Sequence, residues 1–404
     1  ADGVRLKAVR DYATIYIERK HSMLKGVLMR VLSWGVAIFG FCVLALALSL
    51  GWLRRTESAA LWLAYVTDPN GVSQIFVMDF YGEHVRPLTN GVGDDLSPAW
   101  SPANNYVAFA AFRGQASAIY LIPPRGGTLI EIALAIGSAI NPTWSPNGDY
   151  LVFERFTNRG DRSLIGYDLQ TQDLQLLTTP AQLDWYPIWS RQADTLLYLS
   201  STSVANNQLM RLNVRQAQPQ PLTTIARNYS HPTWSPDGRW VAYESSDGDL
   251  WLLDLVTGED QPLLLSIERE TMPIWSPNGA WIAFLRDEAD GTRQVYRINT
   301  SGGALLRLSD PQMVRQAVGA VRWSDGGTWL AYVALGHGTS TTAIYRVGVN
   351  GQQHARLTDH AYNSSSPTWS PTLDDGALHV VWLMLVGGTC CVLGIKIIFG
   401  EDIK

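Results

Sequence analysis

Lysine is nearly absent from this 404-residue chain, with none between Lys25 and Lys396. Charged residues make up only 17% of the sequence, below the roughly 25% of an average soluble domain. Positions 56–376 hold 31 acidic but only 20 basic residues. This balance excludes attraction of the central region to nucleic acid or anionic lipid by charge alone.

Cysteine is almost as scarce. The three cysteines, Cys42, Cys390 and Cys391, all lie in apolar segments near the ends of the chain. They exclude a disulfide framework and a cysteine-ligated zinc site in the central region.

Motifs that carry chemistry are also missing, so we predict no catalytic, cofactor-binding or metal-binding residues. The run Gly336–Ser340 is glycine-rich but lacks the Gly-x-Ser-x-Gly pattern of a hydrolase nucleophile. The acidic stretches Asp94-Asp95 and 287–291 fit solvated loops better than a calcium loop. Histidines are scattered over the chain: His21, His84, His231, His337, His354, His360 and His379. Scatter alone does not exclude a site, because a fold can bring together histidines that are distant in the sequence.

Two long apolar segments flank the central region. Residues 31–53 carry no charge and are long enough to cross a bilayer, with seven basic residues before them and two after. This asymmetry predicts an uncleaved transmembrane helix at 31–53, a cytoplasmic basic segment at 1–30, and the central region outside the plasma membrane of a bacterium. A cleaved signal peptide is the alternative.

Residues 377–400 form the second apolar segment, with Lys396 as their only strong charge. Small residues four positions apart, such as Gly387 and Cys391, would let helices approach closely in lipid. We predict a second membrane helix here, followed by a tail at 401–404. A further β-strand is the alternative.

The central region consists of repeats, and these determine the expected fold. The dipeptide Trp-Ser recurs at intervals of 41 to 48 residues, at Trp100, Trp144, Trp189, Trp234, Trp275, Trp323 and Trp369. Turns such as Pro236-Asp237-Gly238 follow, and then a short aromatic strand such as 240–243. A third strand follows, and a fourth closes on leucine and a hydroxyl residue, as at Leu88-Thr89 and Leu308-Ser309. Four short strands in about forty-five residues are typical of a propeller blade.

The repeats predict an all-β, seven-bladed propeller over 56–376, with six blades as the alternative if the irregular unit 180–223 is degenerate. The first unit lacks its own Trp-Ser strand, and the last unit has a spare one at Trp369. We therefore expect the Trp369 strand to pair with the strand at Trp62 and close the ring, which would remove free sheet edges. The repeated tryptophans are expected to pack between blades.

These units resemble the repeats of the TolB-like propeller family. Residues 231–238, His-Pro-Thr-Trp-Ser-Pro-Asp-Gly, followed by Trp-Val-Ala-Tyr at 240–243, are nearly a full match to the family unit. The resemblance covers about 61–371 and implies a propeller fold. It also implies function through protein contacts.

The predicted function is a non-enzymatic, membrane-anchored scaffold that serves as an accessory subunit of a bacterial membrane complex. Its expected partners are other membrane subunits and membrane lipid, without nucleic acid and without a cofactor. A sensor or ectodomain that binds a glycan or peptide is the alternative. A lyase or hydrolase acting in the propeller funnel is a third possibility.

Overall fold

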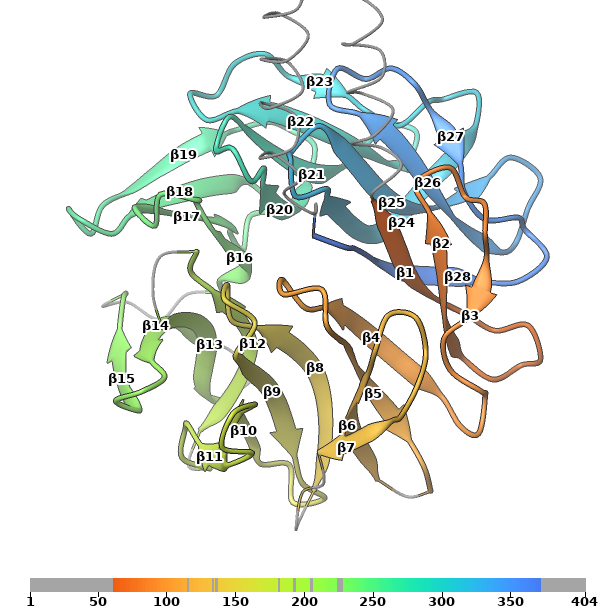
Figure 1. Ribbon diagram of the computed structural model, residues 1–404. Coiled ribbons are helices and arrows are strands. Elements are labelled where there is room, and N and C mark those ends of the chain that lie inside the picture. The colour runs from red at the N-terminus through yellow and green to blue at the C-terminus, as the bar shows by residue number, and fades with distance from the viewer. Residues whose placement is uncertain are drawn as a thin grey trace, which may run out of the picture. The chain divides into compact units, whose positions relative to one another are not determined.

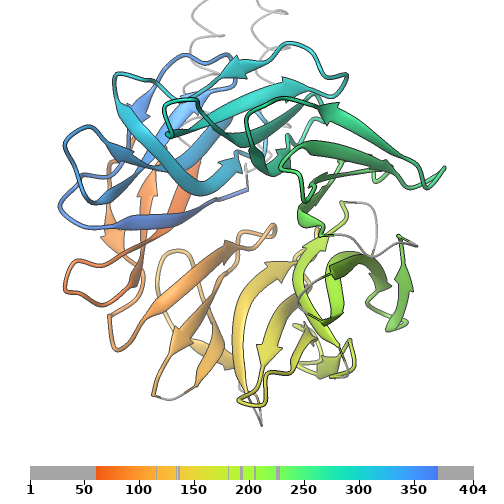
Figure 2. The ribbon, with the colours of Figure 1, turned by 180° about the vertical axis from the view of Figure 1, so that it is seen from behind.

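The computed structural model describes residues 61–371, apart from short gaps at 115, 133, 135–136, 181, 192–193, 204–205 and 224–227. All regular elements in this region are β-strands, arranged around a central opening (Figures 1 and 2). No helix among the described residues is long and apolar enough to cross a bilayer. The predicted membrane helices at 31–53 and 377–400 lie outside the described residues, as do 1–30 and 401–404.

Five sheets have four strands each. The sheet that joins the two ends of the described region has the order β28 (Ser364–Trp369), β1 (Trp62–Thr67), β2 (Gln74–Asp79), β3 (Arg86–Pro87). The next along the chain is β4 (Asp95–Trp100), β5 (Val107–Phe112), β6 (Ser117–Ile122), β7 (Ile130–Ile132). The other three are β16 (Ser230–Trp234), β17 (Trp240–Glu244), β18 (Leu250–Asp254), β19 (Asp260–Leu264); β20 (Glu270–Trp275), β21 (Trp281–Asp287), β22 (Arg293–Asn299), β23 (Leu306–Arg307); and β24 (Val314–Trp323), β25 (Trp329–Gly336), β26 (Thr342–Gly348), β27 (Ala355–Arg356).

The remaining sheet has eight strands. They are β8 (Ser138–Trp144), β9 (Tyr150–Phe156), β10 (Arg162–Asp168), β11 (Leu174–Leu176), β12 (Leu183–Trp189), β13 (Thr195–Ser203), β14 (Asn206–Asn213) and β15 (Gln218–Pro221). Two antiparallel groups of four are joined here by one parallel pairing, Arg162 with Leu183. The irregular unit 180–223 therefore forms its four strands despite its unusual turn.

Strand β28 pairs with β1, as the repeat pattern predicts. Leu63 lies opposite Trp369, and the backbone N–H of Trp62 donates to the Ser370 hydroxyl at 2.9 Å. The two ends of the described region thus share one sheet, which leaves neither end as a free edge at this point.

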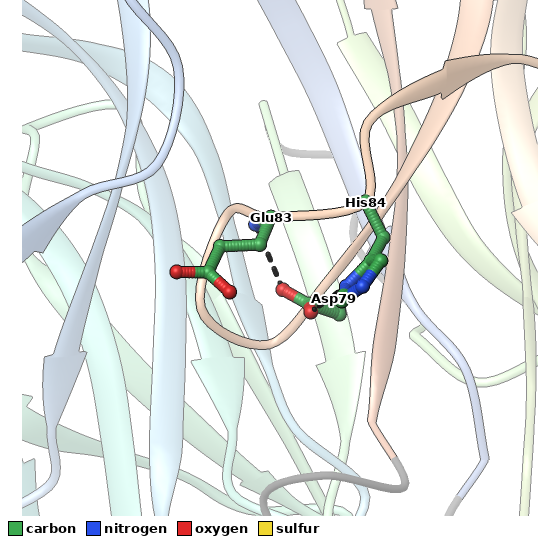
Figure 3. A group of neighbouring side chains, drawn as sticks. All are labelled: Asp79, Glu83 and His84. Carbon is green, nitrogen blue, oxygen red and sulfur yellow. Dashed lines mark hydrogen bonds and ion pairs between the residues drawn. The ribbon is translucent and has the colours of Figure 1, made fainter.

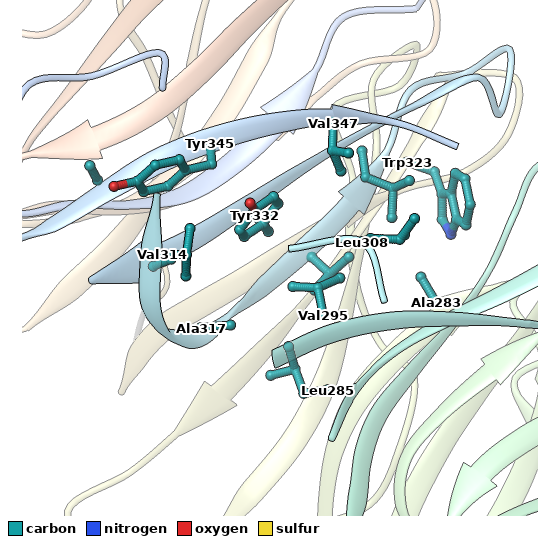
Figure 4. Packing of buried hydrophobic residues seen from close by; sticks show 14 residues of the cluster. Ala283, Leu285, Val295, Leu308, Val314, Ala317, Trp323, Tyr332, Tyr345 and Val347 are labelled. Carbon is teal, nitrogen blue, oxygen red and sulfur yellow. The ribbon is translucent and has the colours of Figure 1, made fainter. Parts of the chain in front are cut away.

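The core lies between neighbouring sheets. The aromatic strands carry apolar side chains on both faces, so each strand contributes to the packing on either side of its sheet. In Figure 4, Leu285 and Val295 of one sheet pack with Tyr332 and Val347 of the next. These side chains are essentially inaccessible to solvent. Burial of each contributes about 1.5–3 kcal/mol of transfer free energy.

The repeated tryptophans hold adjacent sheets together. The indole N–H of Trp144 donates to the Ala99 carbonyl of the preceding sheet at 2.9 Å, and that of Trp369 donates to the Arg322 carbonyl at 3.2 Å. Trp234 and Trp323 repeat this contact at 3.2 and 3.1 Å, and Trp189 makes it at 3.2 Å between the two halves of the eight-stranded sheet. The predicted packing of the tryptophans between units is confirmed.

Candidate functional site in the central channel

Each strand that ends in a repeated tryptophan is interrupted three residues before it. The residue at that point has a φ between 47° and 60° although none is glycine: Ser97, Asn141, Tyr186, His231, Met272, Ala320 and Ser366. The pairing register shifts in the same stretch of these strands. Such a conformation costs about 1 kcal/mol or more for a residue with a side chain, and residues of this kind cluster at functional sites.

These seven residues all line one cavity of about 550 Å³ at the centre of the ring. We call it the central channel. Its volume is in the range of small-molecule binding sites, roughly 300–1,000 Å³. We call the seven strands that end in a repeated tryptophan the inner strands. The interruption turns one side chain of each inner strand toward a common space, and these side chains differ in type from strand to strand.

Glu154 lies at the wall of the central channel and is buried. Its Oε1 accepts hydrogen bonds from Asn141 Nδ2 at 3.1 Å and from the backbone N–H of Tyr186 at 3.0 Å. The guanidinium of Arg162 lies 3.4 Å from Oε2. The carboxylate thus connects β9 to β12 and fixes the backbone that carries Tyr186.

Glu244 occupies the same position in the sheet β16–β19, where it pairs with Ser230 as Glu154 pairs with Ile140. Its Oε2 lies 3.0 Å from His231 Nδ1, and its Oε1 accepts from Arg269 at 2.8 Å. Burial acts to raise the pKa of Glu244, but the bonds from His231 and Arg269 outweigh it and hold the pKa below its usual value.

Tyr186 and Arg322 face the same space from different sheets. Burial within the channel raises the pKa of Tyr186, while Arg322 lowers it and Glu244 and Glu154 raise it further. The rings of Tyr186 and His231 meet edge to face, with centroids 5.7 Å apart. Arg322 is exposed in the channel and donates to the neighbouring Val321 carbonyl at 2.9 Å. Within the described region, no carboxylate pairs with it.

Of the scattered histidines, His231 alone among the described ones lines the central channel. His337 contacts the Pro311 carbonyl, His354 contacts the Gly351 carbonyl in its own turn, and His360 contacts the Tyr345 hydroxyl at 3.1 Å. His21 and His379 lie outside the described residues. The described histidines are thus not gathered into one group.

Asp79, Glu83 and His84 form a cluster with metal-ligating chemistry in the turn between β2 and β3 (Figure 3). Asp79 Oδ1 accepts from the backbone N–H groups of Tyr81 at 2.9 Å and Glu83 at 2.8 Å, and Oδ2 lies 2.7 Å from His84 Nδ1. Aspartates at the same point of two other sheets, Asp168 and Asp254, make similar backbone contacts. The cluster is therefore a repeated turn structure.

Asp95 differs from the prediction of a solvated loop. It is the first residue of β4, is completely buried, and binds the Arg113 guanidinium at 2.5 Å. Burial raises its pKa, and this outweighs the bonds from Thr89 and Arg113. Asp287, in the other acidic stretch, pairs with Arg293 at 2.6 Å.

Sequence reasoning missed the central channel. Its residues are defined only by their distance from the repeated tryptophans, and their types share no motif. A tabulation of the position three before each tryptophan would have found them. The prediction that the chain has no catalytic, cofactor-binding or metal-binding residues stays a prediction.

Comparisons with known proteins agree with this fold. The profile of the TolB beta propeller domain matches residues 59–237 and 214–374. No curated protein sequence is significantly similar to the chain. Among solved structures, TolB from Acinetobacter baumannii is 18% identical with a TM-score of 0.52, over 78% of this chain and 67% of that one.

Two enzymes are also similar in structure. An oligogalacturonate lyase from Vibrio parahaemolyticus is 12% identical with a TM-score of 0.56, over 74% of this chain and 85% of that one. A puromycin hydrolase is 16% identical with a TM-score of 0.58, over 74% of this chain and 52% of that one. This chain therefore spans about half of the hydrolase.

These neighbours contradict the predicted function of a non-enzymatic interaction scaffold. That prediction took the fold as evidence for protein contacts, but a lyase and peptidases have the same fold. The physical reason is that a rigid ring positions side chains in a channel equally well for docking, binding and catalysis. The profile match covers well over half of the sequence, and the chain belongs to the TolB beta propeller domain family.

Proposed function

We propose that this protein binds a small carboxylate-bearing ligand in its central channel. The observation that carries the proposal is Arg322, an exposed guanidinium that lines the channel and has no carboxylate partner among the described residues. A guanidinium binds a carboxylate through two parallel hydrogen bonds, and a partly enclosed site strengthens this contact. Tyr186 and His231 add donors and aromatic surface beside it.

The charges around the channel support an anionic rather than a cationic ligand. The carboxylates nearest the channel are already bound: Glu154 at the wall by Asn141 and Arg162, and Glu244 behind His231 by His231 and Arg269. Arg322 is the charge that stays available to a ligand. An acidic sugar or a peptide carboxylate has the required chemistry, and the likeness to an oligogalacturonate lyase favours the sugar.

Calorimetric titration with digalacturonate tests the proposal, with the uncharged dimethyl ester as the matched ligand. We expect the acid to bind at least about tenfold more tightly than the ester, and Arg322→Gln to remove this difference. Exposed Arg356 provides the control, because Arg356→Gln should leave binding unchanged. Equal affinity for acid and ester, or an Arg322→Gln variant that binds as well as wild type, would contradict the proposal.

Acid–base catalysis on the same ligand is a second candidate, favoured by the contact between His231 and Glu244. A carboxylate on Nδ1 fixes the orientation of the imidazole and leaves Nε2 as the nitrogen that can face a ligand, as in many catalytic pairs. Turnover can be followed by NMR spectra of the digalacturonate over hours. Product formation that disappears in His231→Gln would support catalysis, whereas an unchanged ligand would limit the channel to binding.

We infer that the ring has seven blades, the β8–β15 sheet counting as two. Support comes from the seven interrupted inner strands and from the single parallel pairing that joins the halves of that sheet.

We also propose that 31–53 anchors the propeller on the outer face of a bacterial plasma membrane and that 377–400 crosses it again. Carbonate extraction of membranes, compared with a variant lacking 31–53, tests the anchor. Contacts with other membrane subunits and lipid stay predictions.

A further inference from the structure

We infer that a cavity between two neighbouring sheets binds a guanidinium group, such as the side chain of an arginine in a peptide. The cavity has a volume of about 520 Å³ and lies between β16–β19 and β20–β23. We call this boundary the cavity seam. It is separate from the central channel and is lined by Asp237, Trp240, Leu252, Trp275 and Thr300, among others.

The chemistry of the ligand follows from what the protein itself places at the next two boundaries, which we call the arginine seams. At the first, Arg297 stacks on the Trp281 ring at 3.5 Å and donates through Nε to the Val349 carbonyl of the following sheet at 2.5 Å. At the second, Arg346 lies 3.9 Å from the Phe80 ring and donates to the Phe80 carbonyl at 2.9 Å.

Leu252 stands where the arginine seams have their arginine. The pairing registers establish this equivalence, because Arg297 lies opposite Ala283, Arg346 opposite Ala331, and Leu252 opposite Ala242. Leucine carries no donor and is shorter than arginine. The substitution therefore leaves space at the cavity seam and removes the hydrogen bond across it.

The acceptor at the cavity seam is retained. At the arginine seams, the carbonyl acceptors belong to Val349 and Phe80. Each of these residues comes directly after the residue that pairs with the tryptophan at the start of an aromatic strand. Thr300 is the equivalent residue in the sheet β20–β23. Thr300 lines the cavity, and no described side chain donates to its carbonyl. An aromatic ring is also present, since Trp240 corresponds to Trp281.

Charge favours a cation at this place. The described residues that line the cavity include the carboxylate of Asp237 and no basic side chain. Arg239 lies 5.0 Å from the Trp240 ring, but it is bound to Asp254 at 2.7 Å and does not line the cavity. The indole hydrogen bond of the neighbouring seam is also missing here, because the buried Trp275 indole N–H has no partner among the described residues.

Titration with N-acetylarginine amide tests the inference, with N-acetylcitrulline amide as a probe of the same shape without the charge. Binding can be followed in the indole N–H signals of ¹⁵N-tryptophan-labelled protein, assigned with Trp240→Phe and Trp275→Phe. We expect saturable shifts at Trp240 and Trp275 and at least about tenfold tighter binding of the arginine probe. Equal binding of both probes, or no shift at Trp240, would overturn the inference.

Leu252→Arg supplies the missing guanidinium from within the chain and should abolish binding of the probe. Leu252→Ala keeps the cavity open and should bind it as wild type does. If the arginine variant does not fold, Asp237→Asn gives the second test, with affinity at least about threefold weaker. Wild-type affinity in a folded Leu252→Arg protein or in Asp237→Asn would refute the site.

The inference is independent of the channel proposal. Arg322→Gln should leave binding of the arginine probe unchanged, since Arg322 does not line the cavity seam. Loss of probe binding in Arg322→Gln would place the probe in the central channel and overturn the inference.

Discussion

The cavity seam and the arginine seams join sheets of the same design by different means. At the arginine seams, a guanidinium fills the space between the sheets, stacks on aromatic rings and binds a carbonyl of the next sheet. At the cavity seam, Leu252 leaves this space open, and the contact between Glu244 and Arg269 joins the sheets nearer the channel. The cavity seam thus leaves open a space that the arginine seams fill.

Removal of an arginine from an arginine seam should have the largest effect. Arg346 is partly buried against Phe80 and Trp329, and this burial lowers its pKa. Arg346→Leu should reduce the free energy of unfolding by about 2–3 kcal/mol, because it loses the stacking and the Phe80 hydrogen bond. Urea unfolding measures this loss, and Arg356→Leu, at an exposed position, should cost much less. A cost below that of Arg356→Leu would contradict the comparison.

The ion pair at the cavity seam should give the next largest effect, and it should depend on pH. Glu244 has a folded-state pKa below its usual 4.5. Its stabilising contribution is therefore present above pH 4.5 and is lost as the pH falls through the folded-state value. Glu244→Gln should cost about 1–2 kcal/mol at pH 7, and the cost should shrink below pH 4.5.

Glu270 provides a control with the opposite sign. Burial raises its pKa and outweighs the hydrogen bond from Ser266 and the attraction of Arg286, so its contribution is fully present below pH 4.5 and is lost as the pH rises through the folded-state value. Glu270→Gln should therefore gain stability relative to wild type as the pH rises. The same pH trend in both variants would show that the two carboxylates do not differ as described.

Conversion of the cavity seam into an arginine seam should stabilise the protein moderately. Leu252→Arg supplies a guanidinium that can reach Trp240 and the Thr300 carbonyl, and should raise the free energy of unfolding by about 1 kcal/mol. The measurement is urea unfolding beside Leu252→Met, which adds no charge. A folded Leu252→Arg protein less stable than Leu252→Met would show that the space does not fit a guanidinium.

The smallest expected effect is the difference in stability cost between substitutions of the tryptophans at the two kinds of boundary. Trp323 donates to the Ile274 carbonyl at 3.1 Å, whereas the Trp275 indole N–H has no partner among the described residues. Both rings are 8% exposed. Trp323→Phe should therefore cost about 0.5–1 kcal/mol more than Trp275→Phe in thermal or urea unfolding. Equal costs would mean that the indole bond contributes nothing to the seam.

Much of the fold follows from the sequence because its repeats are regular. The spacing of Trp-Ser predicts the inner strands, and the spare strand at Trp369 predicts the pairing with β1 that the structure has. Asp95 was misread because a paired acidic dipeptide resembles a loop, while its burial depends on Arg113 from the neighbouring strand. Function was misread because the same ring occurs in enzymes.

The two sites are hidden in the sequence for a related reason. Residues of the central channel occupy one structural position but have different side chains, from Ser97 to Tyr186 and Met272. Leu252 looks like an ordinary buried residue of the strand Leu-Trp-Leu-Leu-Asp. Only the pairing register shows that Leu252 is structurally equivalent to Arg297 and Arg346. Neither site can be found from the repeat itself.

The most direct test of a ligand in the channel is the methyl signal of Met272, which lines it, in protein labelled with ¹³C-methyl methionine. The fully buried Met78 serves as the internal reference. On titration with digalacturonate, we predict a saturable shift of the Met272 signal that is absent in Arg322→Gln, with no shift at Met78. A Met272 signal that does not move at saturating ligand would contradict binding in the channel.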